Sequence, residues 1–154
     1  MADDLNGNEW SSEGDELSRH LGLALLPYQV IEGLLKLYIT DTHSLIALML
    51  GGQIPFRFTR KEYENAPMER LITMFARHCD NDDLIKRLRS ALTSRNYVAH
   101  EALRYYVEHD DAAESALETL KGIQKEGLAL MEELYKECRK LEATFDSLQQ
   151  ASTE

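Results

Sequence analysis

The chain is poor in the residues that interrupt helices and in those that build disulfide frameworks. Its 154 residues include three prolines, eight glycines, two cysteines and one tryptophan. So few helix breakers, together with a scarcity of β-branched runs, predict an all-α protein. Cys79 and Cys138 lie far apart in sequence and have no paired metal-ligand spacing. We therefore expect two reduced, mostly buried thiols and no metal or other cofactor.

Long apolar runs are also missing. No segment approaches the roughly 18 consecutive apolar residues that a membrane span needs, and the longest apolar run covers residues 45–50. The N-terminus is acidic and carries no apolar stretch, unlike a secretory signal peptide. We therefore expect a cytoplasmic protein without membrane contact. The length and the 44% hydrophobic content suit one domain with its own core.

Positive charge is scarce, and the formal net charge of −10 argues against broad attraction to nucleic acid. The acids concentrate in residues 1–16 and 108–154, which leaves the segment between them net positive. Four cations in that segment are candidate RNA-binding residues: Lys86, Arg87, Arg89 and Arg104. A local basic stretch attracts phosphate even in an acidic chain. The alternative is that these are solvated charges on a helix face.

Hydrophobic spacing divides the chain into a tail and a helical domain. Residues 1–14 are polar, acidic and aperiodic, and we expect a disordered tail there. A helical pattern begins at residue 15, contains Pro27 and ends at Gly51-Gly52. Beyond Pro27 this helix is apolar on more than one face. It should therefore be packed on several sides, within the domain or against a partner chain.

Residues 51–65 read as a loop that contains Phe56-Arg57-Phe58-Thr59-Arg60-Lys61. Aromatics interleaved with bases are able to stack nucleobases and bind phosphates, but we favour a loop pinned by its two phenylalanines. Asn65 is then expected to cap a helix that has Pro67 in its first turn and runs to about Cys79. Residues 80–83 predict a turn and an N-terminal cap. A metal loop is rejected there because no further ligands follow at the needed spacing.

Two more helices complete the domain. The first is expected at about 82–107, and the second from a capping-box-like start at Asp111 and Glu114 to about residue 148. Gly122 and Gly127 inside the last helix suggest close packing or a bend. The prediction is a four- to five-helix up-and-down bundle over residues 15–148, with a C-terminal tail at 149–154.

The hexapeptide at residues 95–100 is the most informative stretch. The apolar stripe of its helix places Arg95 where an apolar residue should follow, and buried polar groups need partners. Asn96 and His100 share a helix face, about 40° apart, whereas Arg95 and His100 are about 140° apart. One chain brings Arg95 to its own His100 only if the helix is irregular or the long guanidinium stem wraps round. An antiparallel second copy would bring each Arg95 to the other chain's His100, which favours a composite site in a homodimer.

The pattern Arg95-Asn96-x-x-x-His100 on the third long helix resembles the HEPN superfamily of helical-bundle proteins. Members carry Arg, four to six intervening residues and then His, often with a polar residue directly after the Arg. The preceding segments 68–72 and 84–89 also look like the lead-in helices of that family, so the resemblance covers roughly residues 20–145.

The resemblance implies a metal-independent endoribonuclease of a defence, toxin or RNA-processing system. In that scheme His100 moves a proton at the ribose 2′-hydroxyl or the leaving 5′-oxygen, and Arg95 stabilises the phosphorane. Asn96 orients His100 or binds phosphate. A cognate antitoxin or another defence-system protein is an implied partner. One toxin branch has a tyrosine two residues after the histidine, where this chain has Ala102, so regulation through that tyrosine is not expected.

Other interpretations of the cluster stay open. It is also compatible with a buried polar network that fixes helix register. Some HEPN-like proteins are non-catalytic modules that bind RNA or a protein, and a helical adaptor without any nucleic-acid role is a third reading. We interpret the remaining histidines, His20, His43, His78 and His109, as isolated residues without a functional role.

Overall fold

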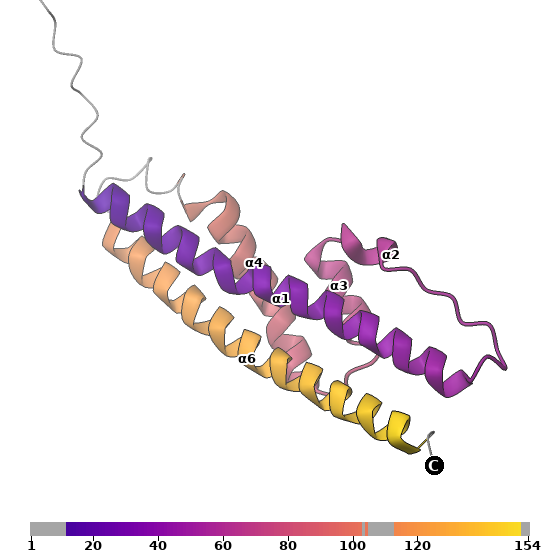
Figure 1. Cartoon of the computed structure of the whole chain (residues 1–154). Coiled ribbons are helices and arrows are strands. Elements are labelled where there is room, and N and C mark those ends of the chain that lie inside the picture. The colour runs from indigo at the N-terminus through magenta and orange to yellow at the C-terminus, as the bar shows by residue number, and fades with distance from the viewer. Residues whose placement is uncertain (1–11, 103, 105–112, 152–154) are drawn as a thin grey trace, which may run out of the picture.

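The computed structural model describes residues 12–102, 104 and 113–151 (Figure 1). This part of the chain contains five helices and no strand. They are α1 (Ser12–Leu50), α2 (Lys61–Glu64), α3 (Met68–Phe75), α4 (Asp82–His100) and α6 (Ala113–Ala151). The predicted all-α bundle is confirmed. α1 begins three residues inside the predicted N-terminal tail, and α6 continues past the predicted end at residue 148. Residues 1–11 and 152–154 of the two expected tails lie outside the described part.

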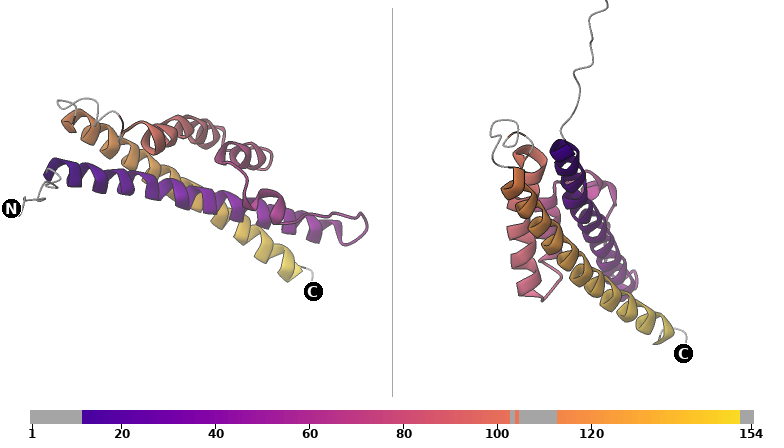
Figure 2. Two further views of the ribbon diagram at one scale, coloured as in Figure 1. Left: turned by 90° about the horizontal axis from the view of Figure 1, so that it is seen from above. Right: turned by 90° about the vertical axis from the view of Figure 1, so that its left-hand side faces the viewer.

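The long helices α1 and α6 run side by side in the same direction (Figures 1 and 2). The Tyr28 hydroxyl of α1 donates to the carbonyl of Ile123 on α6, over 3.3 Å. Further along, the Cys138 thiol donates to the carbonyl of Leu34, over 3.7 Å. α4 runs the opposite way and leans on both. The chain therefore goes up along α1, back through α3 and α4, and up again along α6, as an up-and-down bundle requires.

Two clusters of buried side chains make up the core. The larger one joins α1, α3, α4 and α6, and at its centre the rings of Tyr38 and Phe75 meet edge to face with centroids 4.7 Å apart. The smaller one lies where α4 ends and α6 begins. Its buried members are Leu17, Ala24, Val98, Ala102, Ala116 and Leu120. Both cysteines belong to the larger cluster and are unpaired, which confirms the expectation of buried thiols.

α1 passes through Pro27 without ending there. A Cβ atom on Gly127 of α6 would lie 3.0 Å from the Pro27 Cβ and 3.3 Å from Tyr28, so only glycine lets the two helices approach this closely. The predicted close packing is thus found at Gly127, whereas a Cβ at Gly122 would meet nothing. By length and composition alone α1 could also cross a membrane, a test that the core helix of a soluble protein passes as well.

Several predicted boundaries were wrong. The expected loop at 51–65 includes the short helix α2, and Asn65 lies at its C-terminal end instead of capping α3. Pro67 takes the N-cap position of α3 with an extended ψ of 150°, one residue before the first turn in which it was expected. α3 ends at Phe75, before the predicted Cys79, and α4 ends at His100. The predicted continuation to residue 107 and the cap at Asp111 fall largely outside the described residues.

Candidate functional site

One face of α4 carries a line of exposed polar side chains. Its members recur every three or four residues, which places them on a single face of the helix. They are Lys86, Arg89, Thr93, Asn96 and His100, all exposed to solvent. From first to last they span about 21 Å at 1.5 Å per residue. We call this line the polar face of α4.

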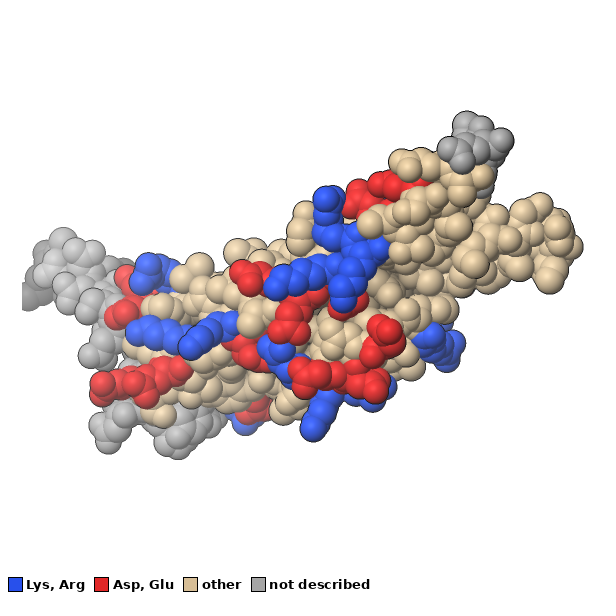
Figure 3. Space-filling view, turned by 90° about the horizontal axis from the view of Figure 1, so that it is seen from below, with Lys and Arg blue, Asp and Glu red and all other residues tan. Residues whose placement is uncertain are grey.

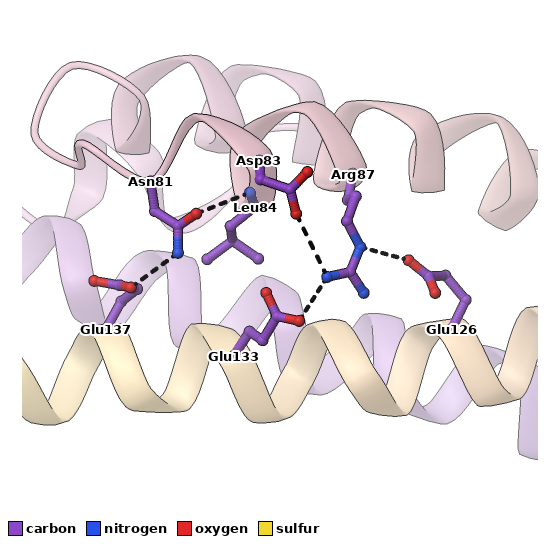
Figure 4. Close-up of polar contacts among 7 residues, drawn as sticks. All are labelled: Asn81, Asp83, Leu84, Arg87, Glu126, Glu133 and Glu137. Atoms are coloured by element: carbon purple, nitrogen blue, oxygen red, sulfur yellow. Dashed lines mark hydrogen bonds and ion pairs between the residues drawn. The ribbon is translucent and has the colours of Figure 1, made fainter.

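The start of α4 is fixed to α6 by Asn81 (Figure 4). Its side-chain oxygen accepts the Leu84 backbone N–H over 3.1 Å, which confirms the predicted N-terminal cap. Its amide donates to Glu137 on α6, also over 3.1 Å. Burial alone would raise the pKa of Glu137, but hydrogen bonds from Lys140 and Asn81 outweigh it and lower that pKa. An ionised, buried carboxylate therefore holds the helix start in place.

Arg87 holds the next turn of α4 to α6 (Figure 4). Its guanidinium lies 3.0 Å from Glu126, 2.5 Å from Glu133 and 3.9 Å from Asp83. Hydrogen bonds to Glu133 and Glu126 raise its pKa further above the ordinary range. A guanidinium surrounded by three carboxylates has little affinity left for phosphate. The structure therefore assigns Arg87 to packing between helices, against its predicted role in RNA binding.

The other three RNA-binding candidates, Lys86, Arg89 and Arg104, differ in whether an acidic side chain lies beside them. Arg104 lies 3.0 Å from Glu101, and both side chains are exposed. Among the residues that the structure describes, neither Lys86 nor Arg89 has an ion-pair partner. Figure 3 shows basic and acidic side chains interleaved over the middle of one face of the molecule. Attraction of a polyanion to α4 would therefore be local and of short range.

Replacement of Arg87 by alanine is expected to lower the free energy of unfolding by about 1 kcal/mol, because Glu126 and Glu133 on α6 lose their shared partner. Lys86→Ala, one residue away on the exposed side, is the matched control and should change it by less than about 0.5 kcal/mol. Urea unfolding followed by circular dichroism measures both. Equal losses in the two variants would contradict the assignment of Arg87 to helix packing.

The hexapeptide at 95–100 lies at the C-terminal end of α4. Arg95 is half-buried, and its Nη1 donates to the Asn96 side-chain oxygen over 3.3 Å. Asn96 and His100 are exposed. The buried stripe continues instead through Val98 and Ala102. The exposure of Asn96 and His100 speaks against the alternative reading of the cluster as a buried polar network.

The printed contact of Arg95 is with its neighbour Asn96, so the two arrangements that would bring Arg95 to His100 stay predictions. The Arg95 guanidinium reaches the side-chain oxygen of Asn96 within one chain. His100 lies one turn beyond Asn96 on the same face. An anion resting on this face meets a bidentate cation, an amide and an imidazole in succession. A second chain is not needed to bring Arg95 and Asn96 together.

A second cluster of functional side-chain types surrounds His43 on α1. Its ring meets those of Phe56, Phe58 and His78 edge to face, with centroids 5.7, 5.3 and 5.7 Å apart. Tyr63 lies next to it, at 6.1 Å. The two phenylalanines thus pin the loop after α1, as favoured from the sequence. His43 and His78 are not isolated, however, and no spacing in the sequence relates residues so far apart.

The histidine pair predicts that stability depends on pH. Burial lowers the pKa of both His43 and His78 from the ordinary 6.5. The unfolded chain then binds these protons more readily, so their contribution to stability is complete above pH 6.5 and is lost as the pH falls below it. Unfolding by urea at pH 7.5 and 5.5 should show this loss in the wild type. The double variant His43→Leu, His78→Leu should lose less unfolding free energy between pH 7.5 and 5.5 than the wild type. The control His100→Ala, at an exposed site, should lose as much as the wild type. A loss in the double variant equal to that of the wild type would contradict the assignment of this pH dependence to the histidine pair.

Comparison of the chain with protein-family models, with curated proteins and with solved structures finds no match. Within the described residues, no group of three or more His, Cys, Asp or Glu side chains is placed to hold a metal ion. The function therefore has to be argued from the polar face of α4 itself.

Proposed function

We propose that this protein is a cytoplasmic, metal-independent endoribonuclease of the HEPN type, acting in a defence, toxin or RNA-processing system. The observation that carries the proposal is the exposed group formed by Arg95, Asn96 and His100, in which the guanidinium is bonded to the amide. Its chemistry suits a phosphodiester: a permanent cation for the phosphate and an imidazole that can accept or donate a proton.

The proposed reaction uses the nucleophile that RNA itself carries. The ribose 2′-oxygen attacks phosphorus, the bond to the 5′-oxygen breaks, and the products are a 2′,3′-cyclic phosphate and a free 5′-hydroxyl. His100 either accepts the 2′-hydroxyl proton or donates one to the leaving oxygen, and water carries the other proton. Arg95 binds the non-bridging oxygens, where negative charge grows in the transition state. Asn96 holds the guanidinium in this orientation.

Lys86 and Arg89 extend the same face toward the start of α4. In this proposal they bind backbone phosphates beside the cleaved bond, without reading the sequence. Arg104, beyond His100, is a weaker candidate because Glu101 lies beside it. The proposed partners are therefore RNA, a second copy of the chain and a cognate antitoxin or other defence-system protein.

A non-catalytic module that binds RNA or a protein is the second candidate. The observation in its favour is that Asn96 and His100 are exposed to solvent in a single copy. Catalytic groups gain strength where water is excluded, so an open helix face suits binding better than turnover. Incubation of RNA with the wild-type protein in EDTA separates the two candidates. Cleavage supports the nuclease, and a gel shift with intact RNA supports the module.

A further inference from the structure

The side of the bundle away from α4 exposes large apolar side chains on both long helices. On α1 these are Leu26, Val30 and Leu37, exposed by 56%, 41% and 48%. On α6 they are Leu128 and Tyr135, exposed by 42% and 55%. Spacings of four and seven residues place each set on one helix face. In Figure 1 the two helices lie in front of α4. We call this surface the α1–α6 face.

The middle of the α1–α6 face is hollowed. A groove of about 370 Å³ lies between the helices, and its lining is almost entirely apolar. The lining residues are Val30, Leu34, Met131, Glu132 and Tyr135. Contiguous exposed apolar surface of this kind, with a concave centre, is typical of protein interaction sites.

Four charges lie at nearly equal distances from the middle of this face, two cations toward its start and two acids toward its end, and the start also carries Asp15 and Glu114. On α1, Arg19 precedes Val30 by eleven residues and Asp41 follows it by eleven, on the same side of the helix. On α6, Lys121 and Glu142 lie about equally far from Met131, the groove residue next to Val30. The negative end gathers Asp41, Glu142 and Asp146 around one hollow, where Arg139 neutralises one acid.

The four charges Arg19, Asp41, Lys121 and Glu142 pair with their opposites when a second copy lies on this face in the reversed direction. Rotation by 180° about an axis through the groove lays α1 antiparallel on α1 of the other copy, with Arg19 opposite the partner's Asp41. The same rotation places Lys121 opposite the partner's Glu142. A parallel pairing would instead bring ends of like charge together, which disfavours it.

Two glycines on the same side of α1 are consistent with a close neighbour. A Cβ atom at Gly22 or at Gly33 would meet nothing within 4 Å in this chain. Glycine inside a helix costs roughly 0.5–1 kcal/mol relative to alanine, and no contact within the chain requires it at these positions. Close approach of another helix is a physical reason for glycine there.

From these observations we infer that the α1–α6 face binds a second copy of this chain, antiparallel, about a two-fold axis that crosses α1 at Val30. Such an isologous interface buries the groove of each copy against the other. It leaves both α4 helices on the outside of the dimer, with their polar faces free for RNA. This dimer differs from the one expected across α4, and it does not depend on the nuclease proposal.

Cysteine cross-linking tests the position of the axis. Val30→Cys places two thiols at the axis, so mild oxidation should give a covalent dimer at micromolar protein. Leu48→Cys is the matched control on the same side of α1. Its two copies would lie 36 residues apart along the helices, about 54 Å, and should not cross-link. The wild type, with Cys79 and Cys138 buried, should stay uncross-linked. No cross-link at Val30, or equal cross-linking at Leu48, would overturn the proposal.

Light scattering tests the association and its register. The wild type should be a dimer, Val30→Glu a folded monomer, and Met49→Glu, an exposed apolar position at the end of α1, still a dimer. Arg19→Glu and Asp41→Arg should each weaken the dimer at least tenfold, and the double variant should restore it. A monomeric wild type at about 100 µM, or no restoration in the double variant, would overturn the proposal. So would a monomer that binds lipid vesicles, because lipid would then be the occupant of this face.

Discussion

Replacement of His100 by alanine is expected to reduce RNA cleavage by a factor of about 10²–10⁴, the usual contribution of a positioned acid or base. In the proposed reaction His100 is the only protein group that moves a proton at the 2′- or the 5′-oxygen. Its side chain is exposed, so the substitution removes no buried contact and should leave stability unchanged. The rate of cleavage of a labelled RNA, measured in EDTA, gives the effect.

The controls separate chemistry from binding. Ser90→Ala changes another exposed position of α4 and should cleave like the wild type. Arg95→Lys keeps the positive charge but loses the bidentate geometry, so it should cleave more slowly while still binding RNA. His100→Ala should bind RNA as tightly as the wild type. Undiminished cleavage by His100→Ala would remove His100 from the mechanism and leave Arg95 and Asn96 as a binding site.

Replacement of Phe75 by alanine is expected to cost about 3–5 kcal/mol of unfolding free energy. Phe75 is fully buried at the end of α3 and packs its ring against Tyr38 on α1. α3 has only eight residues, and a helix this short depends on tertiary packing for its stability. Loss of the ring leaves a cavity between α1, α3 and α4. Urea unfolding at neutral pH measures the change.

The matched control for this cavity is Ile54→Ala, since Ile54 is an apolar side chain that the protein leaves 61% exposed. It should change the unfolding free energy by less than about 0.5 kcal/mol. A loss below about 1 kcal/mol in Phe75→Ala would mean that α3 does not pack on α1 as the structure has it. The position of residues 76–81, which connect α3 to the start of α4, would then differ from the structure as well.

Much of the fold could be predicted from periodicity. Apolar residues that recur every three or four positions predicted helices α1, α4 and α6. The N-terminal cap at Asn81 could be predicted as well, because it depends only on neighbouring residues. The ends of α3 and α4 could not be predicted, because packing decides how far a marginal helix continues. The sequence indicated close packing or a bend at Gly127 but not the segment that packs there. That segment contains Pro27, which lies a hundred residues earlier in the chain.

The sequence indicated which residues form the candidate site, but not how exposed they are to solvent. The sequence singled out Arg95, Asn96 and His100, yet it placed them on a buried stripe from which they point away. The error has a physical origin: helical periodicity gives a direction, whereas the long stem of Arg95 decides where its charge goes. The ion pairs of Arg87 could not be predicted for a related reason. Its carboxylate partners Glu126 and Glu133 come from α6, and only the packing of the two helices reveals them.

End-group analysis of RNA incubated with the wild-type protein in EDTA tests the central claim most directly. The account predicts shorter fragments that carry a 2′,3′-cyclic phosphate on one side of the break and a free 5′-hydroxyl on the other. Those ends follow from attack by the neighbouring 2′-oxygen. Intact RNA, or fragments with a 5′-phosphate, would contradict the assignment of Arg95, Asn96 and His100 as the centre of this reaction.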